Sequence, residues 1–215
     1  MCISNIQAQR KIIAKQDSTE HVPFYNGFYV QADLASAIMS ARSNRDTYSY
    51  EAAIQADIKH KYYPVFEAGF AGADKTSLKN YEFTTSAPFA RLGVDFNLMK
   101  KKKDSKPTNN LFLAGLRLGM SNFNYKISNL SIEDSYWGGS ESVFTSSYNS
   151  TKLWWEIVIG VKVEIYKNVF MGWTGRKRIL ISKDAEGEIF PYYIPGFGVN
   201  TTGNWGLNYT IGYRF

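Results

Sequence analysis

Apolar and polar side chains alternate along most of the chain, with a period of two residues. Such alternation is typical of a β-strand whose two faces meet different surroundings. The pattern recurs eight times, over segments that begin near residue 24 and continue to the C-terminus. These segments are 28–38, 48–59, 64–73, 90–98, 112–121, 155–165, 169–179 and 205–215.

The apolar face of each segment is predicted to point outward and the polar face inward. The sixth segment shows this best: Trp155, Ile157 and Ile159 share one face, whereas Glu156 and Lys162 share the other. A soluble β-sandwich rarely places so many charges on its inner faces. The pattern therefore predicts an all-β fold, an eight-stranded antiparallel up-and-down transmembrane β-barrel with lipid outside and a polar lumen inside.

The links between the segments give a second indication of this fold. A bacterial barrel has short periplasmic turns and longer extracellular loops. With both termini in the periplasm, the outer links are predicted at 42–46, 74–86, 122–151 and 182–203, and three of them are long. The inner links at 60–63 and 166–168 are short, and the lysine-rich one at 100–109 is longer. The predicted location is the outer membrane.

Composition supports a membrane barrel and excludes a helical membrane protein. The longest apolar runs, 111–116 and 157–161, are far shorter than the ~20 residues of a membrane-spanning helix. Aromatic residues make up 16% of the chain and often fall near segment ends, which suits an aromatic girdle. Cys2 is the single cysteine, so no disulfide can form within the chain.

The formal charge of +6 does not indicate a nucleic-acid partner, because four of the positive charges form one run at 100–103. Such a run is usually a solvated turn, and docking to an acidic periplasmic partner is the alternative. Residues 1–8 are predicted to be the remnant of a signal peptide, 9–23 a flexible periplasmic lead and 24–215 the barrel. Lipidation of Cys2 is the alternative interpretation of the N-terminus.

The inward faces carry charges of both signs in equal number. The interior of an eight-stranded barrel is only wide enough to be filled by side chains, so these groups are expected to pair rather than line a water pore. The predicted lumen charge network contains Asp33, Glu51, Asp57, Glu67, Arg91, Asp95, Arg117, Glu156, Lys162, Glu164, Arg176, Arg178 and Arg214, with Lys59 also inward.

The last segment resembles the targeting strand of outer-membrane barrels, which ends on an aromatic residue with apolar residues at alternate positions upstream. Tyr209, Ile211, Tyr213 and Phe215 match that pattern. The resemblance implies recognition by the barrel assembly machinery during insertion.

The chain from Phe24 onward also resembles the small outer-membrane barrels of Bacteroidota, a family labelled as a domain of unknown function. The resemblance rests on the layout of the segments, above all 154–165 and 169–173. It implies a location in the outer membrane and no particular chemistry. Because outer-membrane proteins of that phylum often work in large complexes, it leaves open an accessory role in one of them, including the barrel assembly machinery.

No enzyme site, cofactor or metal site is predicted. The two histidines, His21 and His60, lie in the lead and at the periplasmic end of a strand, and the serine-rich stretch 140–150 contains no histidine. Acidic residues in the outer loops could hold Ca²⁺ weakly, but a solvated loop is the simpler interpretation. These are Glu133, Asp134, Asp184, Glu186 and Glu188.

The preferred function is a non-enzymatic anchor or scaffold that presents its outer loops to a protein partner. Large aromatic side chains of the kind that anchor interfaces lie on those loops, although packing of the loops on each other would also use them. They are Tyr136, Trp137, Phe190, Tyr192 and Tyr193. A surface adhesin is the first alternative, and a lipid A-modifying enzyme that depends on His60 or a loop carboxylate is the second.

Overall fold

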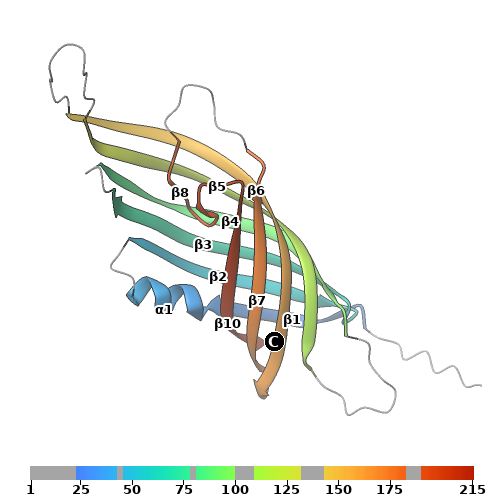
Figure 1. Cartoon of the computed structure of the whole chain (residues 1–215). Coiled ribbons are helices and arrows are strands. Elements are labelled where there is room, and N and C mark those ends of the chain that lie inside the picture. Colours follow the sequence, from blue (N-terminus) through green and yellow to red (C-terminus); the bar gives the residue numbers. More distant parts are fainter. Residues whose placement is uncertain (1–22, 43–45, 78–80, 100–108, 132–142, 183–189) are drawn as a thin grey trace, which may run out of the picture.

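Eight antiparallel strands close into a ring in the computed structural model, which describes residues 23–42, 46–77, 81–99, 109–131, 143–182 and 190–215 (Figure 1). The ring order is β1-β10-β7-β6-β5-β4-β3-β2. The strands are β1 (Tyr25–Asp33), β2 (Thr47–Ile58), β3 (Tyr62–Thr76), β4 (Glu82–Asn97), β5 (Leu111–Ser131), β6 (Val143–Tyr166), β7 (Val169–Leu180) and β10 (Gly203–Arg214). The predicted eight-stranded up-and-down barrel is confirmed.

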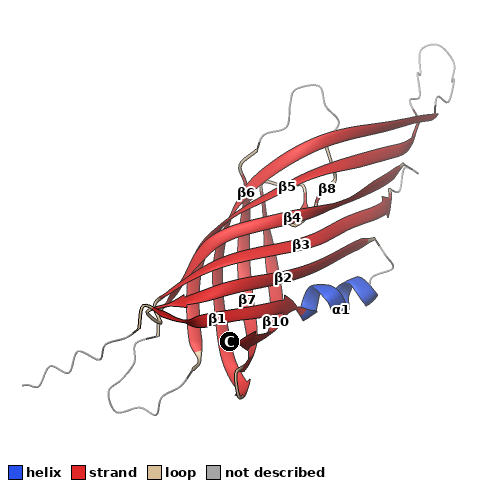
Figure 2. Cartoon of the chain, turned by 180° about the vertical axis from the view of Figure 1, so that it is seen from behind, coloured by secondary structure: helices blue, strands red, loops and turns tan. Residues whose placement is uncertain are grey.

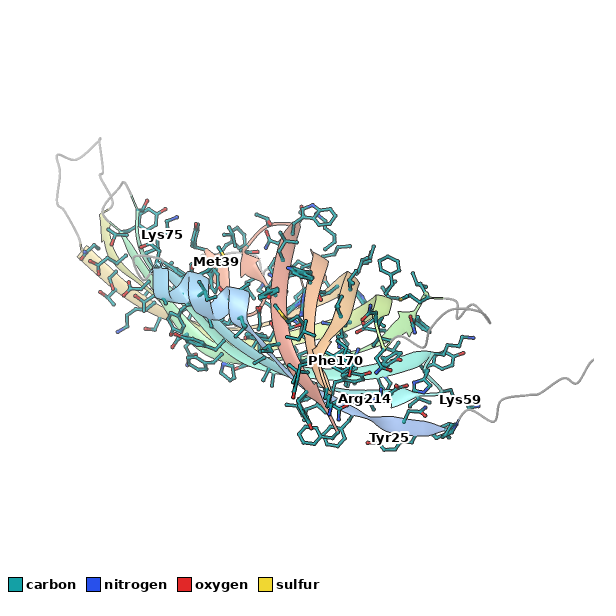
Figure 3. All side chains as sticks on the ribbon, turned by 90° about the horizontal axis from the view of Figure 1, so that it is seen from below. Tyr25, Met39, Lys59, Lys75, Phe170 and Arg214 are labelled. Atoms are coloured by element: carbon teal, nitrogen blue, oxygen red, sulfur yellow. The ribbon has the colours of Figure 1, made fainter. Side chains whose placement is uncertain are left out.

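The two ends of the barrel differ, as predicted. One end, called the turn end, holds the start of β1 and the end of β10, where the Phe215 amide donates a hydrogen bond to the Phe28 carbonyl. The short links at 59–61 and 167–168 lie at the same end. Lys59, His60 and Asn168 have positive φ angles there, which tight hairpins require. The link between β4 and β5 also joins strand ends there, because the Asn97 amide donates to the Lys61 carbonyl. The opposite end, called the loop end, carries the other links. Figure 3 shows Tyr25, Lys59 and Arg214 gathered at the turn end and Lys75 at the loop end.

The outward face of the barrel carries a continuous belt of exposed apolar side chains. Leu92, Ile159 and Leu207 are 66%, 54% and 84% exposed, whereas inward neighbours such as Arg91 and Glu156 are buried. The predicted inward and outward faces are thus confirmed along the segments that form this belt.

Four strands, β3 to β6, are longer than predicted. In β4, β5 and β6 the reason is that the polarity of the two faces inverts at one level of the barrel. Met120 is the last outward apolar residue of β5, and it pairs with Ala90 on β4 and Leu153 on β6. Beyond this line the outward residues of β5 and β6 are polar, those of β4 are polar after Pro88, and the buried inward residues are mostly apolar. Outward are Ser86, Thr84, Asn122, Asn124, Lys126, Thr151, Asn149 and Ser147; inward are Phe83, Ala87, Phe89, Phe123, Tyr125 and Ile127.

The predicted outer links at 74–86 and 122–151 are therefore wrong in their bounds. Most of these residues belong to β3, β4, β5 and β6, and the strand-to-strand links are 77–81 and 132–142. We call the parts of these four strands beyond the line the ledge. Figure 2 shows β5 and β6 running on past the other strands.

The first segment also ends differently from the prediction, because helix α1 (Leu34–Arg42) follows β1 directly. The side chain of Asp33 accepts hydrogen bonds from the Ala35 amide, at 3.1 Å, and from the Ser36 hydroxyl, which makes it the N-cap. Leu34 and Ile38 were assigned to an extended strand, but their spacing of four also fits one face of a helix.

Helix α1 takes the place of a strand at the seam of the barrel. β1 and β10 pair only between Tyr29–Asp33 and Thr210–Arg214, so towards the loop end α1 lies between β10 and β2 (Figure 3). Asp33 also accepts a hydrogen bond from the Tyr209 amide of β10, and Ser40 bonds the backbone of Ser49 on β2. The helix is thus held at both of its flanks.

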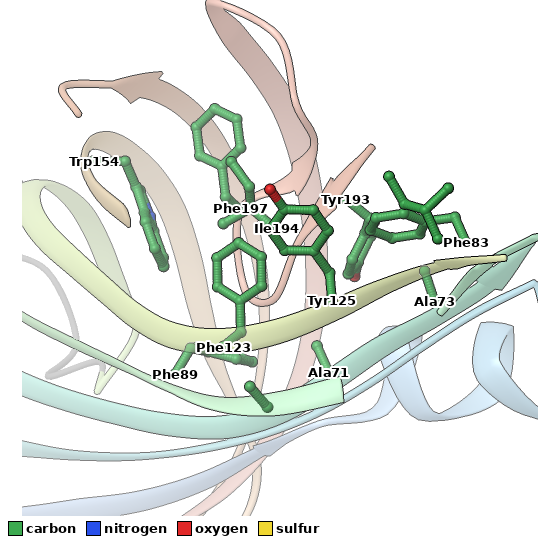
Figure 4. Packing of buried hydrophobic residues seen from close by; sticks show 12 residues of the cluster. Ala71, Ala73, Phe83, Phe89, Phe123, Tyr125, Trp154, Tyr193, Ile194 and Phe197 are labelled. Atoms are coloured by element: carbon green, nitrogen blue, oxygen red, sulfur yellow. The ribbon is translucent and has the colours of Figure 1, made fainter. Parts of the chain in front are cut away.

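The long link before β10 folds into the barrel. Its small hairpin, β8 (Tyr193–Ile194) and β9 (Gly198–Val199), carries the fully buried Ile194 and Phe197 into the interior. We call residues 192–199 the lumen plug. They pack with inward residues of β3, β4, β5 and β6 (Figure 4): Ala71, Ala73, Phe83, Ala87, Phe89, Phe123, Tyr125, Ile127 and Trp154.

The plug corrects one expectation about the partner-binding loops. Tyr193 is only 8% exposed, so it is a core residue and not part of an outer surface. Burial raises the pKa of its phenol. Tyr192 is 38% exposed but accepts a hydrogen bond from Lys75 at 2.9 Å, and Phe190 is exposed. Tyr136 and Trp137 lie outside the described residues.

Gly196 should be required for docking of the plug. Its φ is +81°, and a Cβ there would lie 2.4 Å from the Phe89 ring. We expect Gly196→Ala to lower the free energy of unfolding by at least ~1–2 kcal/mol, the cost of a left-handed backbone for an L-residue. Urea unfolding followed by tryptophan fluorescence measures this.

The matched control is Gly175→Ala, since Gly175 has no positive φ and the nearest atom to a Cβ there would be 3.9 Å away. Equal stability of the two variants would contradict the packing described for the plug.

Candidate functional site

Four arginines and four carboxylates converge inside the barrel below the plug, and together they form its polar core. The arginines come from β4, β5 and β7, and the carboxylates come from β2, β3, β4 and β6. Their side chains are at most 5% exposed, apart from Arg178 at 16%. The eight residues are Arg91, Arg117, Arg176, Arg178, Glu51, Glu67, Asp95 and Glu156.

Glu67 is the centre of this arrangement, because three arginines bind its carboxylate. Arg91 and Arg176 each donate to Oε2, at 3.0 and 2.6 Å, and Arg117 donates to Oε1. Glu51 binds two of the same arginines, Arg91 at 2.6 Å and Arg176 at 2.9 Å. Bonds of this kind are short and strong because both partners are charged.

Glu156 connects the network to the plug. Its carboxylate lies 2.7 Å from the Nε of Arg91 and accepts a hydrogen bond from the Trp154 indole at 2.8 Å. Arg91 in turn donates to the Gly196 carbonyl at 2.8 Å, and Arg178 donates to the Phe197 carbonyl at 3.0 Å. The charges thus satisfy backbone acceptors of the plug as well as each other.

Of the other predicted network residues, Lys162 is joined to this cluster through Gln55, and Asp33 and Asp57 lie apart from it. Asp33 caps α1, and Asp57 lies near the turn end, 2.7 Å from His60 and 3.7 Å from Arg214. Lys162 is buried and donates to Gln55, which binds Asp95 at 2.7 Å.

Two residues predicted to be inward lie nearer the surface. Glu164 is at the rim, where it accepts from Asn109 at 2.6 Å, and Lys59 is in the exposed turn. Conversely, the buried Lys152 was not expected to be inward, because the sixth predicted segment starts only at residue 155. Its inward position follows when the alternation is continued back to residue 152.

The interior leaves little empty space around these groups. The cavity beside Glu51, Glu67, Arg117 and Arg176 measures about 20 Å³, roughly the room that one water needs. Opposite charges in such a site attract strongly, but each has also lost its hydration, so the arrangement holds only if every charge keeps its partners. The site is suited to closing and stiffening the barrel, not to passing solutes.

The predicted insertion signal lies on β10, next to the seam. Tyr209, Ile211, Tyr213 and Phe215 share its outward face, and Phe215 stacks on Phe28 with ring centroids 4.9 Å apart. Recognition of this strand by the assembly machinery remains a prediction.

His60 has the one His–carboxylate contact among the described residues. Its Nδ1 lies 2.7 Å from Asp57, whose other oxygen accepts the His60 amide at 2.9 Å. The second bond belongs to the hairpin turn, which accounts for the pair without catalysis. The described residues contain no group of three potential metal ligands. The acidic loop residues Glu133, Asp134, Asp184, Glu186 and Glu188 lie outside them.

Within the described parts of the chain, no helix is both long and apolar enough to cross a membrane. The fold and the site together define a small closed β-barrel with a charge-paired, plugged interior. The family model described as "Domain of unknown function (DUF6048)" matches residues 1–215, so the chain belongs to that family.

Comparison with curated proteins finds no match. Among solved structures, the crystal structure of Neisserial surface protein A is similar. The two chains are 15% identical with a TM-score of 0.40, and the similarity covers 89% of this chain and 99% of that one.

Removing the charge of Glu67 should destabilise the barrel strongly. Glu67→Gln leaves Arg91, Arg117 and Arg176 buried with one carboxylate fewer, and the loss of one partner in such a network costs roughly 3–5 kcal/mol. Urea unfolding of the full chain in detergent micelles measures the change.

Glu164→Gln is the control, because it makes the same chemical change at the rim, where we expect an effect below about 1 kcal/mol. Similar stability of the two variants would show that the lumen charges do not hold the barrel together.

Proposed function

We propose that this chain spans the outer membrane as a non-enzymatic β-barrel anchor and serves as a scaffold subunit of a larger outer-membrane complex. In this proposal both termini lie in the periplasm, and the loop end with its ledge lies outside. The Bacteroidota type that the sequence resembles is the setting in which we place it, with the barrel assembly machinery as one candidate complex.

The apolar belt is the observation that supports a membrane location. Exposed apolar patches on soluble monomers rarely exceed a few hundred Å². Here exposed apolar side chains cover the outward side of every strand of the ring. On β5 they extend from Phe112 to Met120, a length close to the ~9–11 residues of a tilted membrane-spanning strand. The polarity line at Met120, Ala90 and Leu153 then marks the outer edge of the hydrocarbon layer.

The closed interior favours an anchor over a channel. Paired charges fill the middle of the lumen, and the plug fills its outer part through Ile194 and Phe197. A solute path would require both to move.

The ledge supplies a rigid surface for a partner. Its outward face is a row of amides and hydroxyls that bond one another: Asn122 donates to Thr151 at 2.6 Å, and Asn149 donates to Asn124 at 2.8 Å. Pre-ordered groups lose little conformational entropy on binding, which favours association. An adhesin would use the same surface with a partner on another cell, so the nature of the partner decides between these functions.

Co-purification of the full chain tests the scaffold function. We expect the tagged protein, extracted from its native membrane in mild detergent, to carry a stoichiometric protein partner. Asn149→Arg puts a long cation into the middle of the ledge face and should remove that partner.

Lys167→Ala is the control, since Lys167 is exposed at the opposite end of the barrel. A monomer free of partners would contradict the scaffold function. A lipid change that depends on His60, tested with His60→Ala, would favour the enzyme instead.

A further inference from the structure

One lysine lies on the lipid-facing side of the barrel. The outward residues of β7 within the belt are Val169, Met171, Trp173, Gly175, Lys177 and Ile179. Among the described residues of the belt, Lys177 is the only outward one with a charge. A cation that faces hydrocarbon costs free energy, and the cost is smallest near the membrane interface. An anionic partner for Lys177 would offset this cost.

Lys177 lies near the loop end of β7 and β10, since β7 ends at Leu180 and β10 begins at Gly203, and its side chain leans towards that end. Lys177 pairs with Ile157 on β6 and with Trp205 on β10. Its Nζ would lie 3.4 Å from a Cβ at Gly203, one step nearer the loop end. This is the snorkelling geometry that brings an ammonium group to the level of lipid head groups.

The ammonium group of Lys177 contacts an aromatic ring and no acidic side chain of the described residues. It lies over the Trp205 ring, 4.9 Å from the ring centroid, and makes no salt bridge with the described residues. Trp205 is itself 78% exposed. A tryptophan and a lysine side by side at this level are typical of residues that anchor to the membrane interface.

A hollow of about 240 Å³ lies directly below Lys177 on the same face. It arises because Gly175 has no side chain, whereas its neighbours on the outward face are large: Ile159, Val161, Trp173, Leu207 and Tyr209. In Figure 1, β7 runs between β6 and β10, so the three strands form the floor. The volume is many times the ~10–15 Å³ that one water needs by the same measure, enough for a stretch of acyl chain.

We propose that Lys177, Trp205 and the hollow at Gly175 form a binding site for one anionic lipid of the outer leaflet, with its phosphate on Lys177 and an acyl chain over Gly175. The inference rests on the proposed membrane location. Charge complementarity at Lys177 and continuity of the hollow with the apolar belt select a phosphate-bearing lipid as the occupant rather than a protein.

Quenching of tryptophan fluorescence by brominated lipids tests this site. The full chain is placed in vesicles that contain brominated phosphatidylglycerol or brominated phosphatidylcholine. The signal of Trp205 is the part that Trp205→Phe removes. We expect the anionic lipid to be preferred roughly fivefold at Trp205, the contribution of one lysine at an anionic surface.

Four variants make the test specific. Lys177→Gln should abolish the preference for the anionic lipid, and Lys177→Arg should keep it. Lys126→Gln removes the same charge from the ledge and should also keep the preference. Gly175→Leu fills the hollow and should weaken quenching by both lipids at Trp205.

Equal quenching by the two lipids in the unmodified chain, or a preference that survives Lys177→Gln, would overturn the site. Unchanged quenching in Gly175→Leu would overturn its acyl-chain part. Absence of quenching of any tryptophan by either lipid would instead contradict the membrane location itself.

Discussion

A ring of eight strands leaves an interior that only the side chains of its own wall and links can fill, and this constraint governs the rest of the structure. Because one face of each strand is apolar towards the outside, the other face must supply the filling. Here it supplies charges, and these charges satisfy one another: Glu67 alone binds Arg91, Arg117 and Arg176. The interior is thereby specified as well as filled, since each carboxylate needs particular arginines from other strands.

The same constraint explains the change of polarity near the loop end. Past Met120 the outward face bears Asn122 and Asn124, and the inward face bears Phe123 and Tyr125. That arrangement suits a wall with water outside and a hydrophobic core inside, and the plug provides the core's other half. The arginines sit at the junction, where Arg91 and Arg178 bond both the carboxylates and the backbone of the plug.

The sequence allowed prediction of the part of the fold in which apolar side chains face outward and polar ones face the lumen. The eight strands, the short turns and most of the charge cluster follow from period-two alternation alone. The ledge was missed because its alternation continues with polar residues outward and apolar residues inward, so 122–151 resembles a polar loop. The signal was that Phe123, Tyr125 and Ile127 continue the inward series of Arg117 and Gly119.

Other features depend on contacts that a linear pattern does not contain. Helix α1 had a local signal in Asp33 followed by small residues, but its place at the seam depends on β10 and β2. Burial of Tyr193 depends on a long link folding back into the ring. Lys177 could have been found by continuing the outward series of β7 past Trp173.

We infer that β6 has lipid on one face, a closed core on the other and water beyond the polarity line. The reactivity of single cysteines, in a Cys2→Ser background, towards a membrane-impermeant maleimide in intact cells tests this arrangement. Thr151→Cys should react rapidly, whereas Ile159→Cys in the belt and Val158→Cys in the lumen should react only after denaturation. Rapid reaction of Val158→Cys would show a water-filled lumen, and rapid reaction of Ile159→Cys would show that no lipid covers the belt; either result would contradict this arrangement of β6.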